Sequence, residues 1–244
     1  MKKPLIFTSL SVLLILSLAG CTISMVTGSG KLITDNRSVS GFSSLLFAGI
    51  GDVTITQGAS ESLKIEAEDN IMSKIVTTVK DGQLYIGFER ENWQDMVNPT
   101  KGIKFTLTVK NLKSIELSGV GSITAPAFKA DKLEIKVGGA GGIKISKLES
   151  AAVTASMNGA GNLELSGKVT DLDVTLSGVG NFSCGDLQVQ NAKVTVTGAG
   201  GATVWASANL NVSITGAGTV GYYGSPKISK NVTGLGVLNE LGAK

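Results

Sequence analysis

Apolar and polar residues alternate with a period of two between residues 113 and 244, in short segments separated by Gly-x-Gly triplets. This alternation is typical of β-strands with one buried face. The first glycines of the triplets recur every 18 to 20 residues, at Gly119, Gly139, Gly159, Gly178, Gly198, Gly216 and Gly234. A fixed repeat of this length indicates a repeat architecture, in which each unit is a strand, a corner and a second strand.

Alignment of the repeats on the first glycine produces columns of like residues. The position two residues before the glycine is always apolar, and the position four before it is apolar except at Lys230. The first of these columns contains Leu117, Val137, Met157, Leu176, Val196, Ile214 and Val232. A single repeat cannot bury its apolar face alone, so like residues are expected to stack in parallel ladders. The sequence therefore predicts an all-β fold, a parallel β-helix-like solenoid with coils of about 18 to 20 residues and Gly-x-Gly corners.

The glycines of the triplets are predicted to be structural. They lie where the backbone must turn between two strands, and glycine adopts a positive φ without steric cost and leaves room for the neighbouring coils. The predicted turn glycines are Gly49, Gly51, Gly119, Gly121, Gly139, Gly141, Gly159, Gly161, Gly178, Gly180, Gly198, Gly200, Gly216 and Gly218. Residues 216–221 also match the dinucleotide motif G-x-G-x-x-G, but a strand is expected after them where that motif requires a helix.

Residues 31–112 are predicted to form an irregular N-terminal β part of the domain, ahead of the solenoid repeats at 113–244. Asp81-Gly82, between two alternating runs, indicates a hairpin because this dipeptide favours a two-residue turn. One helical turn is expected near residues 70–74, and the polar segment 89–102 is expected to be a loop.

The first twenty residues have the organisation of a lipoprotein signal peptide, with Lys2 and Lys3 before an apolar run. The run ends in LAGC, which resembles the lipobox of bacterial lipoproteins and implies that Cys21 becomes the lipid-modified first residue. Thr22 after the cysteine implies sorting to the outer membrane. A membrane-spanning helix is the alternative, but the run is short and lacks a charged stop. Residues 21–30 are expected to be a flexible tether between the lipid and the domain.

The composition of the chain argues against several classes of function. The chain has 22 Lys and Arg against 19 Asp and Glu, and no histidine. Such a balance gives no basis for nucleic-acid binding, which needs clustered cations. The lack of histidine removes the commonest catalytic triads and the imidazole ligands of metals, so no cofactor and no metal site are expected.

Two chemical candidates remain inside the repeats. Cys184 occupies a column that is otherwise apolar, and it is expected to pack in the core rather than act as a nucleophile. Glu134 and Asp173 share the column five residues before the glycine, two coils apart, or roughly 9 to 10 Å at the spacing of parallel strands. This is near the separation of the carboxyl pair in inverting glycosidases, so a polysaccharide-acting enzyme is one alternative. A solvated strand face is the preferred interpretation, because Thr154 and Lys193 occupy the same column.

Small polar side chains and one tryptophan are candidates for partner recognition. The column directly before the glycine is expected to form a hydrogen-bonded ladder, with contact to a glycan or peptide as the alternative. It contains Ser118, Asn158, Ser177, Thr197, Thr215 and Thr233. Trp93, in the polar loop, is a candidate for binding a partner or for covering an end of the solenoid. Open ends of a β stack also favour self-association.

Several segments together resemble the bacterial "putative auto-transporter adhesin, head GIN domain" family. They are FSSL at 42–45, GDVTITQG at 51–58, VKDGQLYI at 79–86 and LKSIELSGVG at 112–121. The resemblance covers nearly the whole mature chain and implies a right-handed β-helix-like fold in envelope or secreted proteins, without assigning catalytic or binding residues.

With the lipobox, this resemblance predicts a lipid-anchored binding or scaffolding module of the cell envelope, an adhesin without catalytic activity. It would contact the membrane through Cys21 and a glycan or an envelope protein through its surface. An envelope-assembly or lipid-handling accessory protein, which would need a continuous apolar groove, is the other alternative.

Overall fold

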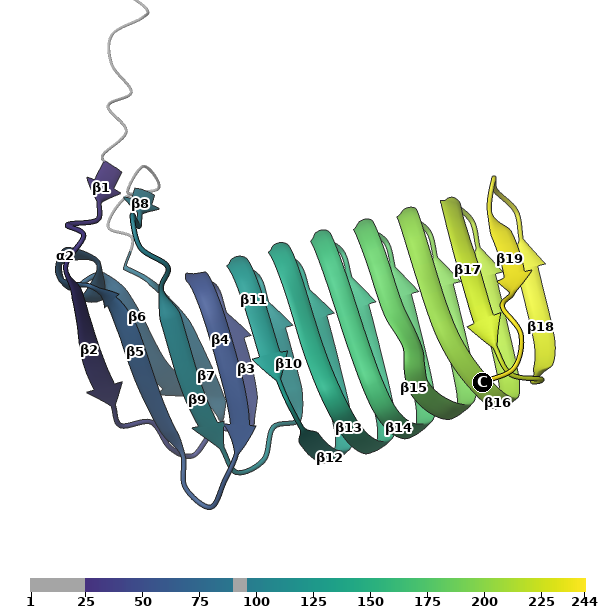
Figure 1. Cartoon of the computed structure of the whole chain (residues 1–244), viewed down its shortest axis with the longest axis horizontal. Helices are drawn as coiled ribbons and strands as arrows, with labels where there is room; N and C mark the ends of the chain where they lie inside the picture. Colours follow the sequence, from purple (N-terminus) through teal and green to yellow (C-terminus); the bar gives the residue numbers. More distant parts are fainter. Residues whose placement is uncertain (1–24, 90–95) are drawn as a thin grey trace, which may run out of the picture.

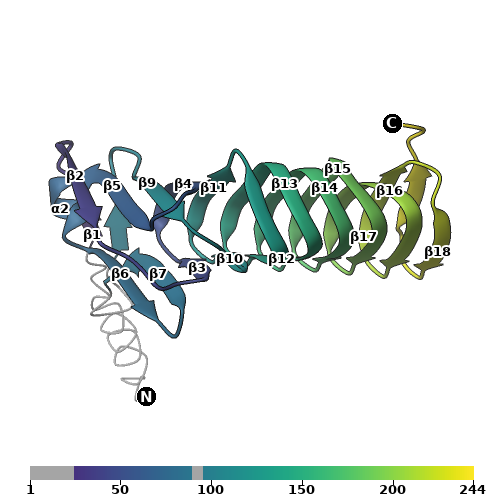
Figure 2. The same cartoon turned by 90° about the horizontal axis from the view of Figure 1, so that it is seen from below.

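The protein, described by a computed structural model for residues 25–89 and 96–244, is an elongated parallel β-solenoid (Figures 1 and 2). About 72% of the described residues are in strands, and the solenoid has about six turns. The predicted fold class is therefore confirmed. Cys21 and Trp93 lie outside the described residues.

The stack begins with the coil around the outlying triplet. This coil consists of β3 (Ser44–Phe47) and β4 (Ile50–Gln57). The next coil begins with β10 (Ser114–Leu117), parallel to β3, and continues with β11 (Val120–Ala125), parallel to β4. The two triplets are aligned in this register, so residues from within the segment 31–112 form the first turn of the solenoid.

The following coils are built by long strands that bend. Apart from β12, which begins midway round its coil, each begins at one Gly-x-Gly corner, crosses to the opposite edge of the coil, and returns to the next corner (Figure 1). These strands, joined in parallel register, are β12 (Phe128–Val137), β13 (Ala140–Met157), β14 (Ala160–Leu176), β15 (Val179–Val196) and β16 (Ala199–Ile214). The last coil consists of β17 (Ala217–Tyr223), β18 (Lys227–Val232) and β19 (Val237–Glu240).

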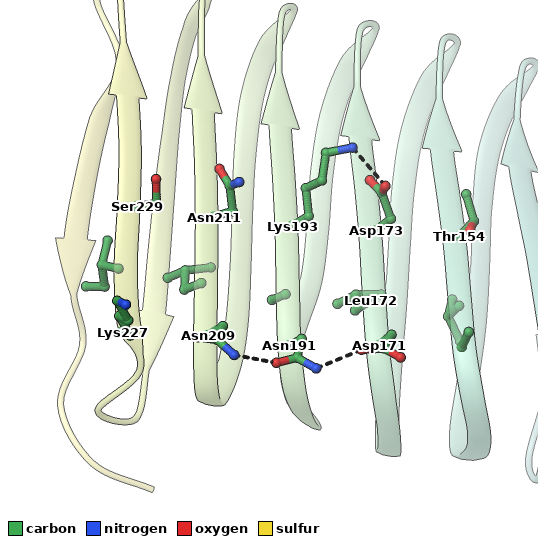
Figure 3. A pocket seen from close by; sticks show the side chains of 15 residues that line it. Thr154, Asp171, Leu172, Asp173, Asn191, Lys193, Asn209, Asn211, Lys227 and Ser229 are labelled. Carbon is green, nitrogen blue, oxygen red and sulfur yellow. Dashed lines mark hydrogen bonds and ion pairs between the residues drawn. The ribbon is translucent and has the colours of Figure 1, made fainter.

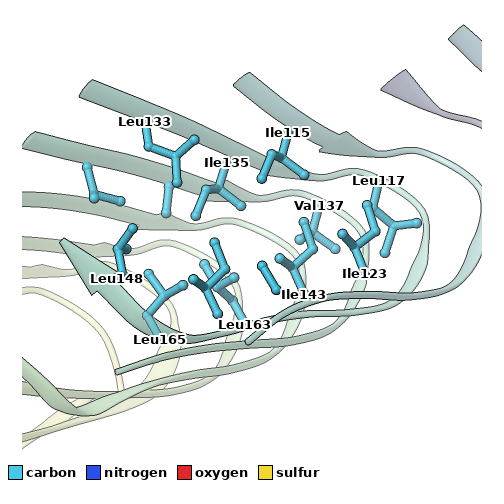
Figure 4. Close-up of a cluster of buried hydrophobic side chains, with 14 of the residues drawn as sticks. Ile115, Leu117, Ile123, Leu133, Ile135, Val137, Ile143, Leu148, Leu163 and Leu165 are labelled. Atoms are coloured by element: carbon cyan, nitrogen blue, oxygen red, sulfur yellow. The ribbon is translucent and has the colours of Figure 1, made fainter. Parts of the chain in front are cut away.

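Like residues of successive coils form buried ladders inside the stack, as Figure 4 shows for one part of the core. Val137, Met157, Leu176 and Val196 are consecutive partners in the register and are almost completely buried. The predicted ladder is therefore confirmed, and the interior is filled by side chains.

The segment that closes each coil is more regular than the sequence suggested. Phe128, Leu148 and Leu187 are buried there, and the backbone remains paired with the neighbouring coils. The register shifts between Ile145 and Leu148, and again between Glu164 and Ser166. These irregularities absorb the differences in length between coils.

The corners need glycine chiefly because neighbouring backbones approach one another closely. A Cβ atom on Gly139 would overlap the carbonyl oxygen of Gly119, and one on Gly161 would overlap that of Gly141. The same overlap recurs at both glycines of each triplet from Gly119 to Gly200. The predicted positive φ is the lesser reason, because among the triplet glycines it occurs only at Gly51, Gly121, Gly141 and Gly180.

An insertion between the first two coils covers the N-terminal end of the stack. Together with β2 (Leu32–Arg37), it contains β5 (Ser62–Glu68), α2 (Asp69–Met72), β6 (Ile75–Lys80), β7 (Gln83–Phe88) and β9 (Lys104–Val109). β5 pairs antiparallel with β2 and β9, and β6 and β7 form the predicted hairpin with positive φ at Asp81 and Gly82. Phe105 of β9 packs edge-on against Phe47 of the first coil, with 5.2 Å between ring centroids.

Part of the expected tether belongs to the folded domain. Strand β1 (Met25–Thr27) pairs in parallel with β8 (Met96–Asn98). The buried carboxylate of Glu68 then accepts hydrogen bonds from the N–H groups of Gly30 at 2.6 Å and Thr100 at 2.8 Å. These contacts hold residues 25–30 against the cap, so this part of the expected tether is not a free linker.

Candidate functional site

A groove of about 580 Å³ crosses five neighbouring strands, β13, β14, β15, β16 and β18 (Figure 3). It lies on the outer surface of the strand segments that lead toward the corners. Two rows of polar side chains border it along the solenoid axis. The first row contains Asp171, Asn191, Asn209 and Lys227, and the second row contains Thr154, Asp173, Lys193, Asn211 and Ser229.

The first row is held in place by hydrogen bonds between its own side chains. Asn191 donates from Nδ2 to Oδ1 of Asp171 at 2.8 Å, and Asn209 donates from Nδ2 to Oδ1 of Asn191 at 2.7 Å. Each amide uses only part of its capacity in this ladder, because an Asn has two N–H donors and two acceptor lone pairs. The row therefore presents oriented, partly free polar groups to the groove.

The second row carries the charged pair of the groove. Lys193 Nζ lies 2.9 Å from Asp173 Oδ2, and both side chains are about half exposed. Because this ion pair is open to water, it contributes little to the free energy of folding. Either side chain is therefore free to turn toward a ligand.

The floor between the two rows is apolar. Leu172, Ala192 and Leu210 are successive partners in the register and are almost completely buried. Ile228 continues this column in the last coil, where it is 39% exposed. Polar walls over an apolar floor are the usual construction of a small-molecule site.

A second hollow of about 630 Å³ adjoins the first and shares Ala152 and Thr154 with it. Its lining includes Lys113, Lys132 and Glu134. The two hollows lie on the same strand columns, so together they form one track along the solenoid, which we call the axial groove.

The structure places the proposed carboxylate pair in this axial groove. Glu134 and Asp173 are two steps apart in one column, with Thr154 between them, as the sequence predicted. Each carboxylate has its own lysine: Lys136 Nζ lies 2.9 Å from Glu134 Oε1, and this hydrogen bond raises the pKa of Lys136.

An inverting glycosidase needs one of its two carboxyls protonated, usually through apolar surroundings. Glu134 and Asp173 instead lie in similar surroundings, because the side chain of each is almost half exposed and each faces a lysine. Glu134 and Asp173 therefore have the separation and the groove that an inverting glycosidase needs. Their contacts do not provide the apolar surroundings that would make one carboxyl the acid and leave the other as the base.

Cys184 lies in the core. Its side chain is completely buried, and burial raises the pKa of the thiol to about 12, partly offset by a backbone hydrogen bond with Leu165. The thiolate needed for nucleophilic attack is therefore strongly disfavoured. The prediction that Cys184 packs as an apolar residue is confirmed.

The expected ladder directly before the glycines is only partly formed. Thr197 donates to Ser177 across one coil step at 3.0 Å. The longer side-chain ladder is the one through Asn191, seven residues before the glycine, which the sequence analysis did not identify. The spacing of Asp171, Asn191 and Asn209, 20 and 18 residues apart, was the signal that could have revealed it.

In the described parts of the chain, no helix is long and apolar enough to cross a membrane. The other tryptophan, Trp205, is half-buried on the outer surface, with Lys244 Nζ 5.9 Å from its ring centroid. It lies away from the axial groove.

Three solved structures illustrate what the chain is similar to. A "putative adhesin" of Bacteroides fragilis is 28% identical, with a TM-score of 0.84 and coverage of 88% of this chain and 100% of that one. A "putative lipid binding protein" of Parabacteroides distasonis is 22% identical, with a TM-score of 0.72 and coverage of 89% and 100%. A "putative adhesin" of Parabacteroides merdae is 23% identical, with a TM-score of 0.66 and coverage of 89% and 99%. The last two likenesses concern the fold alone.

Among curated proteins, no sequence matches the chain. A family model described as "putative auto-transporter adhesin, head GIN domain" matches residues 41–226, which extend from just before β3 to just after β17. The resemblance seen in the sequence is confirmed, and the chain belongs to this head GIN domain family.

Proposed function

We propose that this protein is a lipid-anchored binding module of the bacterial cell envelope, which holds an extended glycan in the axial groove and does not transform it. The observation that carries the proposal is the groove, with two rows of polar side chains over an apolar floor. The family and the similar structure from Bacteroides fragilis support an adhesin-like role at the cell surface or envelope.

The spacing of the coils favours a sugar chain over a peptide. Parallel strands lie about 4.8 Å apart, so each row repeats its polar groups at about that interval. An extended peptide advances roughly 3.3 Å per residue and would lose register with the coils. The hydroxyl groups of a hexose suit the Asn, Asp and Lys side chains of the walls, and its apolar ring face suits the exposed Ile228, where the floor reaches the last coil.

Calorimetric titration of the protein with envelope and host glycans tests this. The double variant Asn191→Ala/Asn209→Ala is expected to bind roughly tenfold more weakly, because it removes two oriented amides from the groove. The matched control is Asn162→Ala/Asn181→Ala, a second amide pair linked at 3.4 Å that lies outside the groove. Equal loss in both double variants would contradict the groove as the binding site.

Lipid anchoring rests on the lipobox that ends at Cys21. Cys21→Ala is expected to yield a chain without the mass of the lipid, and to move it from the membrane fraction to the soluble fraction. Unchanged mass and unchanged membrane retention would overturn the anchor.

The absence of catalysis is tested by incubation with the glycans that bind. We expect the glycans to remain intact. Cleavage that disappears in Glu134→Gln or Asp173→Asn would favour the enzyme alternative. A lipid-handling role has less support, because the groove has polar walls and the core columns are filled.

A further inference from the structure

The middle residue of the Gly-x-Gly triplet is apolar at every corner. These residues, which we call the corner ridge, are Ile50, Val120, Ala140, Ala160, Val179, Ala199, Ala217 and Leu235. They do not belong to the core: Val120 is 52% exposed, Val179 is 63% exposed and Leu235 is 89% exposed.

Packing within the protein does not explain the corner ridge. The flanking glycines are fixed by the close approach of neighbouring backbones, but the middle side chains are exposed from Val120 onward, and only Ile50 is half-buried. Exposed turns normally carry polar residues. An edge that exposes an apolar side chain at each of its corners is typical of a surface that is covered by something else.

The borders of the corner ridge carry no charge from the second coil onward. The column before the triplet consists of Ser118, Gly138, Asn158, Ser177, Thr197, Thr215 and Thr233. The column after it consists of Ser122, Gly142, Asn162, Asn181, Gly201, Thr219 and Val237. These two columns offer no charged side chains with which a protein partner could form ion pairs. An uncharged apolar edge instead suits the headgroup region of a bilayer.

The corner ridge is continuous with the place where the chain enters the domain. Met96 and Val97 of β8 line a hollow of about 440 Å³ together with Ile50 and Val120. β1 pairs with β8, and Met25 and Met96 are 54% and 52% exposed. Figure 1 shows β1 and β8 at the same edge of the molecule as the corners.

We propose that the corner ridge is a membrane-contact edge, which lays the solenoid along the bilayer with its axis parallel to the surface. The inference rests on the proposed lipid on Cys21, because Met25 is only four residues further along the chain. The anchor supplies a high local concentration of membrane, so weak apolar contacts of the ridge suffice to fix the orientation.

This orientation determines where the axial groove lies relative to the membrane. The first row lies seven residues before the corner glycine, which is roughly 23 Å along an extended strand. The groove would therefore face the space above the membrane, where a glycan can reach it without displacing lipid.

A depth measurement on the lipidated full chain tests the orientation. A fluorophore is attached at Val179→Cys, and in a matched variant at Lys168→Cys, midway between two corners at the opposite edge. Cys184 need not be removed, because it is buried with a thiol pKa of about 12. On phosphatidylcholine vesicles containing brominated lipid, quenching at 179 is expected to be roughly threefold stronger than at 168.

Varying the salt concentration and the lipid charge distinguishes apolar from electrostatic contact with the membrane. Because the ridge is uncharged, the quenching at 179 is expected to change little with anionic lipid or with salt up to about 0.5 M. Equal quenching at both sites, or a native-membrane crosslink from 179 to a protein in place of lipid, would overturn this inference alone. A chain without lipid on Cys21 would overturn the proposed anchor, and this inference with it.

Discussion

The two ends of the solenoid are closed in different ways. At the N-terminal end, the insertion covers the first coil, and Ile65 and Phe105 are buried between cap and stack. At the C-terminal end, β18 and β19 each pair on one side only, and Ile228, Val232 and Val237 are 39 to 50% exposed. The repeat therefore builds the body of the stack, whereas each end needs sequence that departs from the repeat.

One departure from the repeat at the open end changes a column that is buried in the other coils. Lys230 pairs with Val212 and thereby continues the column four residues before the glycine, which is apolar in every other repeat. A charge placed in the buried column of an edge strand discourages another strand from pairing with it. One end is thus covered by added structure, and the other is protected by added charge.

The largest expected difference between the ends concerns the corner glycines. Gly121 has φ of +138°, and a Cβ atom there would overlap the carbonyl oxygen of Gly51 in the covered first coil. At Gly218, near the open end, the nearest atoms would be Val196 Cγ1 at 2.6 Å and the Gly200 carbonyl oxygen at 2.9 Å. In urea denaturation, Gly121→Ala is expected to cost about 4 kcal/mol or to prevent folding, and Gly218→Ala about 1 to 2 kcal/mol.

Equal losses in these two variants would mean that the open end is as rigid as the covered one. A smaller loss at Gly121 than at Gly218 would contradict the tighter approach of the backbones at Gly121.

The second prediction concerns the carboxylate that ties the cap together. Burial alone would raise the pKa of Glu68, but the hydroxyl of Thr100 and the N–H groups of Gly30, Thr100 and Lys101 donate to it and hold its pKa below 4.5. A group with a lowered folded-state pKa stabilises the protein fully above its unfolded value and loses this effect as the pH falls. The melting temperature is therefore expected to decline below about pH 4.5.

Glu68→Gln tests this assignment, because it cannot accept all four hydrogen bonds and does not titrate. Proteolysis near residues 25–30 is expected to accelerate roughly tenfold at pH 7, since the entry segment loses its fixed acceptor. The acid-dependent decline in melting temperature should also become shallower. Glu240→Gln is the control at the open end, where Glu240 accepts one hydrogen bond from Tyr222 at 3.2 Å. An unchanged pH profile in Glu68→Gln would assign the acid sensitivity to other carboxyls.

The body of the stack was predictable from the sequence, because its determinants are local and periodic. The spacing of residues such as Val137 and Met157 encodes the register, and Asp81-Gly82 encodes the hairpin. The place of the first coil was not predictable in the same way. Ser44–Phe47 pairs with β10 across a long insertion, and this pairing does not follow the spacing of 18 to 20 residues that marks the later coils.

The candidate site was predicted only in part. The shared column of Glu134 and Asp173 followed from the repeat, whereas the lysine that pairs with each depends on side-chain conformations. The groove itself depends on how the strands bend where the register shifts. Alternation predicts which side of a strand a residue occupies, but it does not predict the curvature of the surface.

The smallest expected effect concerns the charge at the open end. Lys230→Val restores the apolar column, and the change in unfolding free energy is expected to stay within about 1 kcal/mol, because the site is exposed. Its consequence is association: without the charge, the free edge of β18 can pair with a second copy. Sedimentation velocity should show dimers above roughly 10 µM, as expected for a small interface.

Lys227→Val, in the same strand but on the groove side, is the matched control and should leave the assembly state unchanged. Dimers in both variants would assign the effect to lost surface charge in general, and a monomeric Lys230→Val would show that the open end is protected by something other than this lysine.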